Sequence, residues 1–403
     1  MKNDVALIKC ENYDQINVDK AVMEAISKLG GIESFVKSGQ NVVLKVNLVS
    51  KATPEKATTT HPSVVEAVGK LVKNVGANVI IADSAGGPYN ESAMSGIYKA
   101  SGMTEIAERN GFKLNDNYAS FQAELPQGKV SQKFEILDVL EKADVIINLT
   151  KLKTHCFTGM SNAVKNMFGA IPGLIKVEMH GQYKTLSVFG GFLFDIQEYF
   201  KDKLVLHLTD AIVGMEGPGP TSGTPRKIGA IIAGSNPAYV DFVASCLINL
   251  DPYKLPFYNV AVERGWIDKD LPVNVLGEKV ESLVVKDYNT VQANEFTPFA
   301  NSMPKWLQAY VQKLTTRRPY VNRKKCKGCK KCFEHCPVKA ITMVPTKKGG
   351  TPKAKFDYNK CIRCFCCQEL CPFQLVQVKS GIVYKIVHRK DKKESKMKSA
   401  NKI

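Results

Sequence analysis

The chain has 403 residues, enough for two or three domains with a sizeable buried core. Its apolar fraction of 44% and charged fraction of 23% are ordinary for a soluble protein. No apolar run reaches the length that spans a membrane, and the first residues lack the apolar region of a signal peptide, so we expect a cytoplasmic protein.

The formal net charge of +18 is concentrated in the last quarter of the chain. Residues 301–403 contain 26 Lys and Arg against 5 Asp and Glu, a net +21, which leaves 30 against 33, or −3, for residues 1–300. Such a positive field suits a nucleic acid, a membrane surface or an acidic protein, and a solvated lysine-rich surface is the plain alternative. A nucleic acid is not expected, because the interleaved aromatic residues that stack on bases are not obvious here. We favour an acidic protein as the partner, for example a flavodoxin or a ferredoxin.

Strand-like and helix-like segments alternate along residues 1–290. The predicted strands lie at 5–8, 42–46, 78–82, 144–149, 204–208 and 228–233, and helical spacing of apolar residues marks 62–75 and 237–250. This alternation predicts an α/β domain with a mainly parallel sheet and helices on both faces.

Polar residues gather just after several of these strands. Asn47, Asp83, Ser84, residues 150–155 and Asp210 each follow an apolar run. Ligands of open α/β sheets bind at the carboxyl ends of the strands, so we expect a binding site there.

Residues 291–320 read as a connector. Within it, residues 304–315 have the spacing of a short amphipathic helix, which we expect to pack in the core or between domains. Residues 321–388 form a second domain, rich in cysteine. Residues 389–403 are rich in Lys and Ser without apolar periodicity, and we predict a disordered basic tail.

Nine of the twelve cysteines lie between residues 326 and 371, and their spacing is more specific than their number. Two runs share the pattern Cys-x2-Cys-x2-Cys-x3-Cys-Pro. The first run is Cys326, Cys329, Cys332 and Cys336, and the second is Cys361, Cys364, Cys367 and Cys371. A zinc ribbon would use two separate Cys-x2-Cys pairs, and it would need neither the third cysteine nor the proline.

This pattern is that of the bacterial two-cluster ferredoxins, in which the fourth cysteine of each run ligates the cluster of the other run. We therefore expect two [4Fe–4S] clusters. One would be held by Cys326, Cys329, Cys332 and Cys371, and the other by Cys361, Cys364, Cys367 and Cys336. Cys366 is out of register, and we predict that it is a spare thiol beside the second cluster.

Six segments together resemble the family called domain of unknown function 362, over roughly residues 40–250. They are Lys45-Val46-Asn47-Leu48, Thr60-His61-Pro62, Asp83-Ser84-Ala85-Gly86-Gly87, Lys151-Leu152-Lys153-Thr154-His155, the run from Thr158 to Asn166, and the run from Asp210 to Pro220. Members often carry the same two-ferredoxin-motif tail. The resemblance implies an iron–sulfur redox protein of bacteria or archaea, commonly anaerobes, and it implies no particular reaction.

Lys151, Lys153 and His155 are expected to follow a strand, with Thr158 opening a helix. That helix would place four residues on one face, namely Asn162, Lys165, Asn166 and Gly169. A helix N-terminus beside Lys and His suits a carboxylate or phosphate, whereas the plain alternative is a solvated basic face with an N-cap. We predict that the ligand is bound by Lys45, Asn47, Lys165, Asn166 and Glu216.

The histidines suggest acid–base chemistry rather than metal binding. His61, His155 and His180 with Asp83 or Asp210 could hold a metal, but no short His spacing supports it. We predict catalytic roles for His155, His61 and Lys153, with a histidine supplying protons beside an electron source. Glu216 lies in a Gly/Pro-rich loop and would orient a substrate or a lysine, unless this loop is purely structural. NAD and ATP motifs are absent from the sequence.

Three functions follow from these predictions. The first is an iron–sulfur oxidoreductase that passes low-potential electrons from two clusters to an anionic substrate or cofactor in the α/β domain, with room for a further cofactor such as a flavin. The second is a non-catalytic electron-transfer or assembly protein whose α/β domain binds a partner. The third is a metal-dependent α/β enzyme with structural clusters.

Overall fold

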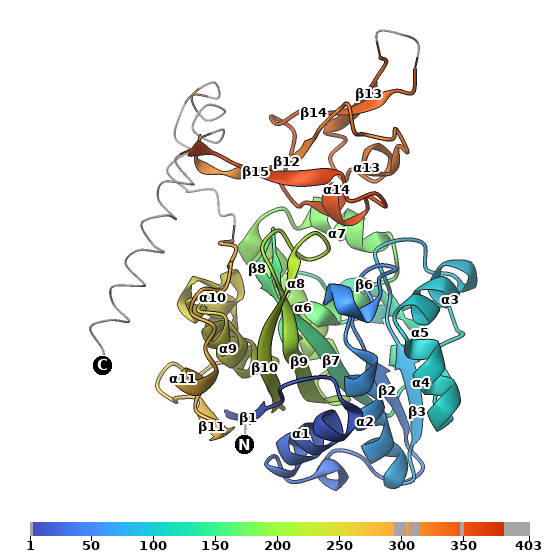
Figure 1. The fold of residues 1–403 in the computed structure, drawn as a ribbon, viewed down its shortest axis with the longest axis vertical. Helices are drawn as coiled ribbons and strands as arrows, with labels where there is room; N and C mark the ends of the chain where they lie inside the picture. Colours follow the sequence, from blue (N-terminus) through green and yellow to red (C-terminus); the bar gives the residue numbers. More distant parts are fainter. Residues whose placement is uncertain (1–2, 294–303, 305–306, 308–313, 347–349, 383–403) are drawn as a thin grey trace. The chain divides into compact units, whose positions relative to one another are not determined.

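The computed structural model describes residues 3–293, 304, 307, 314–346 and 350–382 (Figure 1). The chain separates into an N-terminal unit, Met1–Ala293, and a C-terminal unit, Asn294–Ile403. Most of the helix expected at 304–315 and the whole tail at 389–403 lie outside the described residues.

A mainly parallel sheet forms the centre of the N-terminal unit. Its strands are β1 (Asp4–Lys9), β2 (Asn41–Lys45), β3 (Asn78–Ala82), β4 (Lys113–Leu114), β7 (Val145–His155), β8 (Gly159–Ser161), β9 (Leu204–Glu216), β10 (Thr224–Gly234) and β11 (Asn274–Gly277). They lie in the order β11-β1-β10-β9-β7-β2-β3-β4, and β8 pairs with β7. The pairs from β9 through β7, β2 and β3 to β4 are parallel, whereas β10 is antiparallel to both of its neighbours. The predicted α/β class is therefore confirmed.

Helices cover both faces of this sheet. On one face, Leu44, Ile147 and Leu208 share a core with four helices. These are α1 (Gln15–Ser27), α2 (Pro62–Asn74), α3 (Glu91–Ala100) and α4 (Met103–Asn110). The other face is covered by α6 (Ala163–Asn166), α8 (Leu186–Tyr199) and α9 (Pro237–Leu247) (Figure 1). Because successive strand residues point to opposite faces, the predicted runs of consecutive apolar residues are buried on both sides.

Smaller elements complete the N-terminal unit. They are the hairpin of β5 (Ser120–Glu124) and β6 (Lys133–Leu137), and the helices α5 (Asp138–Glu141), α7 (Ile175–Gln182), α10 (Pro256–Glu263) and α11 (Val280–Leu283).

Two strands continue well past their predicted ends. β7 was expected to stop at residue 149 and β9 at 208, but they run to His155 and Glu216. Lys151, Lys153 and Asp210 therefore lie within strands rather than after them. Their charges ended the apolar pattern on which the prediction depended, although all three are buried.

The prediction of a helix that begins at Thr158 is wrong. Residues 153–155 of β7 turn back through a hairpin into β8, and α6 begins only at Ala163. A 3-10 turn, η3 (Met167–Ala170), follows α6 directly. Asn162 therefore lies before the helix, and the tighter 3-10 turn departs from the four-residue spacing on which the predicted face depended. A helical segment this short also has a weaker summed dipole than the expected anion site required.

The C-terminal unit is small and built from two antiparallel pairs of strands. β12 (Arg317–Val321) pairs with β15 (Val376–Ser380), and β13 (Ile341–Val344) pairs with β14 (Lys353–Phe356). Two short helices, α13 (Lys331–Glu334) and α14 (Cys366–Glu369), accompany them. Among its described residues few apolar side chains other than cysteines are buried, namely Val321, Ala340, Ile341, Ala354, Phe365 and Val376, and part of this core packs against several cysteines. So small a core calls for a metal centre or another crosslink to be stable.

Replacing Ile147 with Ala should lower the free energy of unfolding of the N-terminal unit by about 2–5 kcal/mol, because the fully buried side chain would leave a cavity. Chemical denaturation followed by near-UV circular dichroism measures this change. Ile16, which is 79% exposed on α1, offers the control, and Ile16→Ala should change stability by less than about 0.5 kcal/mol. Equal effects of the two changes would contradict the proposed core.

Candidate functional site

The two cysteine runs follow the same backbone path. Three pairs of residues at equivalent positions share left-handed backbone conformations: Gly328 and Arg363 (φ 71° and 59°), Lys330 and Phe365 (both 64°), and Lys339 and Gln374 (50° and 51°). Five of these six residues are not glycine, and a left-handed conformation costs such a residue roughly 1 kcal/mol. Backbones that alternate between right- and left-handed conformations point successive N–H groups into a concavity, which is a common feature of iron–sulfur sites.

The thiols group across the two runs. Burial, followed by the nearby thiols of Cys329, Cys326 and Cys371, raises the pKa of Cys332 to about 11. Burial likewise raises the pKa of Cys361 to about 11, with the thiols of Cys364 and Cys336 adding to the effect. In each case the fourth cysteine comes from the other run.

A small pocket lies among the cysteines of one group. Its lining includes Cys336, Cys361, Cys364 and Cys367. The fourth cysteines are also held alike, because the N–H of Ala340 donates to Cys336 Sγ (3.2 Å) and that of Leu375 donates to Cys371 Sγ (3.4 Å). Four thiols spaced around one pocket fit a [4Fe–4S] cluster, in which each thiolate binds a different iron.

Among the described residues, no three His, Cys, Asp or Glu side chains converge on one metal position, as a structural zinc ion would require. This includes the grouping considered for His61, His155 and His180 with Asp83 or Asp210.

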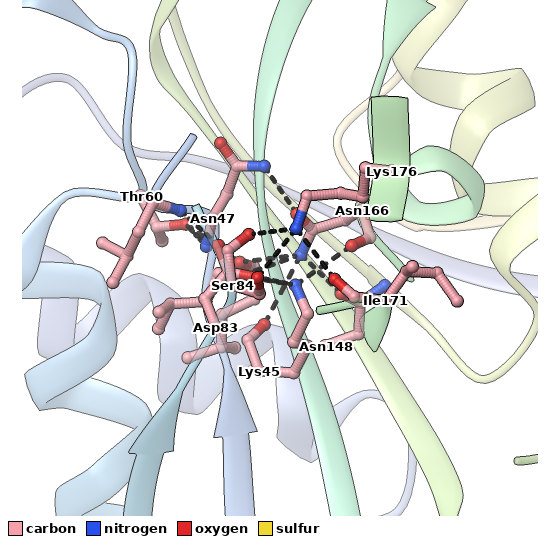
Figure 2. A network of polar contacts seen from close by, with 12 residues as sticks. Lys45, Asn47, Thr60, Asp83, Ser84, Asn148, Asn166, Ile171 and Lys176 are labelled. Carbon is pink, nitrogen blue, oxygen red and sulfur yellow. Dashed lines mark hydrogen bonds and ion pairs between the residues drawn. The ribbon is translucent and has the colours of Figure 1, made fainter. Parts of the chain in front are cut away.

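At the carboxyl end of β2, Lys45 is fully buried and forms an ion pair with Asp83 (Nζ to Oδ1, 2.6 Å) (Figure 2). Its ammonium group also donates to the carbonyls of Val46 (2.9 Å) and Asn166 (3.0 Å). Burial lowers the pKa of Lys45, and the Asp83 carboxylate opposes this effect. Gly169 is required beside this pair, because a Cβ there would lie 2.3 Å from Asp83 Oδ1 and 2.6 Å from Lys45 Nζ.

A directed chain of hydrogen bonds crosses the sheet from Lys153 to His207. Lys153 Nζ donates to Asn47 Oδ1 (2.5 Å). Asn47 Nδ2 then donates to Asn166 Oδ1 (2.6 Å), and Asn166 Nδ2 donates to Asn148 Oδ1 (2.7 Å) (Figure 2). Asn148 Nδ2 then lies 2.9 Å from His207 Nδ1. Because the Lys153 ammonium group can only donate, each asparagine in turn accepts at Oδ1 and donates from Nδ2. The last donor, Asn148 Nδ2, therefore makes His207 Nδ1 an acceptor, and the hydrogen of the neutral His207 ring lies on Nε2. Burial lowers the pKa of His207 to about 3, which keeps the ring neutral.

A second buried ion pair joins β7 to β9. Lys151 Nζ donates to Asp210 Oδ2 (2.8 Å) and to the hydroxyl of Tyr13 (2.7 Å), which donates to Asp210 Oδ1 (2.8 Å). His61 stacks on Tyr13, with ring centroids 3.6 Å apart, and its Nδ1 accepts from the N–H of Ser63. Burial lowers the pKa of His61 to about 4, so the imidazole is neutral near pH 7.

The other predicted site residues have separate surroundings. His155 is buried, and its Nδ1 accepts from the N–H groups of Phe157 and Thr158. Glu216 accepts from the N–H of Asn289 (2.9 Å) at the end of β9. Lys165 is partly exposed, with its ammonium group 5.6 Å from the ring centre of Phe168.

Comparison with known proteins defines the family. The profile named domain of unknown function 362 matches residues 42–245, which is half of the chain. The chain belongs to this family. The profile of the 4Fe–4S dicluster domain matches residues 325–375, so the C-terminal unit is an iron–sulfur module of the ferredoxin type.

Two relatives cover different parts of this family member. A thylakoid-associated protein of Synechocystis is 31% identical over 262 residues, covering 64% of this chain and 78% of the relative. A pyruvate synthase subunit, PorD, of Thermotoga maritima is 34% identical over 62 residues, covering 15% of this chain and 58% of that subunit. The second match, like the dicluster profile, supports iron–sulfur electron transfer.

Solved structures are only distantly similar to this family member. The lactate racemase apoprotein of Thermoanaerobacterium thermosaccharolyticum has a TM-score of 0.37 at 16% identity, covering 60% of this chain and 57% of that one. A Thermotoga maritima protein solved by structural genomics has a TM-score of 0.29 at 14% identity, covering 53% of this chain and 54% of that one.

Across the parts of the chain that the structure describes, no helix combines the length and the apolar character that a membrane crossing requires.

The structure joins some of the predicted residues and separates others. Direct contacts link Lys45, Asn47, Lys153 and Asn166. His61 instead belongs with Lys151, and His155 and Glu216 each bind nearby backbone. All three N–H donors of Lys45 have acceptors within the protein, so its anion-binding role stays a prediction, as do the catalytic roles of His155, His61 and Lys153.

Sequence reasoning missed Tyr13, Asn148 and His207. Tyr13 lies outside the family segments, and nothing near it in the sequence marks it. Asn148 and His207 each interrupt an otherwise apolar strand, which was a usable signal, because a buried polar side chain in such a strand requires a partner.

Replacing Lys45 with Met should lower the free energy of unfolding by about 3–5 kcal/mol, because the Asp83 carboxylate would be left buried without its counter-charge. The double variant Lys45→Met/Asp83→Asn should lose clearly less than the sum of the two single changes. Chemical denaturation of the four proteins in a double-mutant cycle measures the coupling. Additive losses would show that the ion pair contributes nothing.

The low pKa of His207 predicts a loss of stability in acid. An unfolded histidine has a pKa near 6.5, so between that value and about 3 the unfolded chain binds a proton that the folded protein excludes. From about pH 7.5 to about pH 5, His207 should therefore lower the free energy of unfolding by about 2 kcal/mol. The fall should be smaller by this amount in His207→Gln.

Comparing the two proteins at each pH cancels the other titrating groups. One of these is buried Asp241, whose pKa is raised by burial to about 7 and acts in the opposite direction. Identical pH profiles for the variant and the parent would refute the neutral, buried state of His207.

Proposed function

We propose that the chain is an oxidoreductase that carries low-potential electrons through two [4Fe–4S] clusters in its C-terminal unit. One cluster would be bound by Cys326, Cys329, Cys332 and Cys371, and the other by Cys361, Cys364, Cys367 and Cys336. The observation that carries this proposal is the matched backbone path of the two runs, with the thiols grouped across them. When bound, two adjacent clusters supply one-electron transfer steps.

The N-terminal unit would bind the substrate or cofactor that exchanges these electrons. His61, which precedes α2, and Lys165 on α6 are both partly exposed, unlike the buried Lys45 and His155. The neutral ring of His61 accepts at Nδ1, so its Nε2–H is the hydrogen that it can donate to a ligand. Lys165 would contribute positive charge toward an anionic group.

The second candidate is a non-catalytic electron carrier or assembly protein. The observation that favours it is the closed network around Lys45 and Asn166, whose polar groups bind one another instead of facing a ligand. In that case the N-terminal unit would bind a partner protein through another surface.

We also propose that the electron donor or acceptor is an acidic redox protein, because the last quarter of the chain carries a net +21. The cytoplasm is the proposed location, because thiols that ligate clusters persist where thiols are kept reduced.

The exchange of the fourth cysteine can be tested by single replacements in the anaerobically purified protein. The parent should contain about eight irons per chain. Cys371→Ser should alter the cluster held by the first run, and Cys336→Ser that held by the second. Redox titration monitored by electron paramagnetic resonance identifies which centre changes, with Cys329→Ser and Cys364→Ser as reference signals for the two centres. The exchange would be contradicted if Cys371→Ser altered the cluster held by the second run and Cys336→Ser altered the cluster held by the first run.

Catalysis is tested by reoxidation of the chemically reduced protein. A screen of small carboxylates and phosphates should reveal a compound that reoxidises the clusters at least about tenfold faster than buffer does. Lys165→Met and His61→Gln should each slow this reaction while leaving chemical reduction unchanged. If acidic ferredoxins reoxidise the protein and no small compound does, the carrier function replaces the enzymatic one.

A further inference from the structure

The two cysteine runs differ sharply in charge, although their backbones match. We compare the first-run loop, residues 323–331, with the equivalent second-run loop, residues 358–366. The first-run loop carries six Lys and Arg, whereas the second-run loop carries two, Lys360 and Arg363, and neither loop has an acidic residue. The six cations are Arg323, Lys324, Lys325, Lys327, Lys330 and Lys331.

The two loops also differ in exposure. All six cations of the first-run loop are exposed, and so is Cys329 between them. In the second-run loop, Cys364, Phe365 and Cys366 are buried, and Arg363 is only partly exposed. A cluster held by the first run would therefore lie closer to solvent than one held by the second.

Two large aromatic side chains are exposed beside the thiols of the first group. Phe333, 43% exposed, follows Cys332, and Phe373, 50% exposed, lies two residues after Cys371. Exposed phenylalanines are unfavourable in water, whereas aromatic side chains often anchor protein interfaces. Apolar anchors together with surface charge of one sign match a protein partner of the opposite charge.

We propose that the first-run loop, with Phe333 and Phe373, is the docking surface for an acidic redox protein, and that electrons enter or leave through the cluster of Cys326, Cys329, Cys332 and Cys371. This inference rests on the proposed two-cluster function. It specifies the class of partner and the cluster that exchanges electrons with it. In each transfer from a reduced partner, the partner loses one electron and this protein gains it. No covalent bond forms or breaks, and the electron transfer requires no proton transfer.

Charge reversal in the full-length, cluster-loaded protein tests the surface. The probe is a chemically reduced acidic ferredoxin, mixed with the oxidised protein in a stopped-flow spectrometer at low ionic strength. Lys327→Glu/Lys331→Glu should lower the second-order rate constant at least about tenfold, because opposite charges accelerate association. The parent's rate should also fall steeply with added salt, and the variant's much less.

A matched control separates local docking from total charge. Lys355→Glu/Lys360→Glu changes the net charge equally, at exposed positions outside the first-run loop. This control should slow the reaction less than about threefold. Phe373→Ser should lower the rate constant by a similar factor at low and at high salt, because it removes an apolar contact and no charge. The slope of the rate constant against salt concentration should therefore stay at the parent's value. Iron content and reduction by dithionite should stay at the parent's values in every variant.

Several results would overturn the proposal. Equal slowing by both double variants would show that only total charge matters, and no slowing by either would place docking elsewhere. Binding of a labelled single-stranded oligonucleotide that is lost in Lys327→Glu/Lys331→Glu, with no reaction toward ferredoxin, would assign the surface to nucleic acid. In each of these cases, an iron content equal to the expected value would show that the proposed two-cluster function stands although the docking surface does not. A parent protein that assembles no [4Fe–4S] cluster would overturn both proposals together.

Discussion

The burial of lysine charge at the carboxyl end of the sheet determines most of the N-terminal unit's polar architecture. Lys45, Lys151 and Lys153 each have at most 1% of their surface exposed. An ammonium group removed from water must be matched by a carboxylate or by several hydrogen-bond acceptors. Asp83, Asp210 and Asn47 meet this requirement, so much of the family's polar signature can be explained as internal pairing before any ligand is considered.

The same burial explains where sequence-based reasoning succeeded and where it stopped. The sheet's strands and their class could be predicted, because apolar runs such as residues 78–82 mark buried strands directly. The ends of β7 and β9 could not, because Lys151 and Asp210 read as surface residues in any local pattern. Each is buried only because the other is present 59 positions away, and local periodicity cannot detect such a pair.

The iron–sulfur character of the C-terminal unit was predictable for the opposite reason. Spacings of two and three residues set the local loop geometry, so the iron–sulfur character follows from a few adjacent positions. The chain from Lys153 to His207 instead draws residues from β7, α6 and β9 and from the segment that follows β2. Its members are adjacent only after the sheet has formed, and therefore only a structure could connect Asn47 to His207.

The two cysteine loops separate what a cluster requires from what a partner requires. Lys330 and Phe365 occupy equivalent positions with the same φ of 64°, although one side chain is an exposed cation and the other a buried ring. Shared backbone geometry follows from the need to direct N–H groups toward a cluster, which the side chain scarcely affects. The side chains are then free to diverge, so a difference between equivalent positions reports on surroundings and not on ligation. By this reasoning, the concentration of exposed positive charge in one loop alone indicates a surface shaped by a partner.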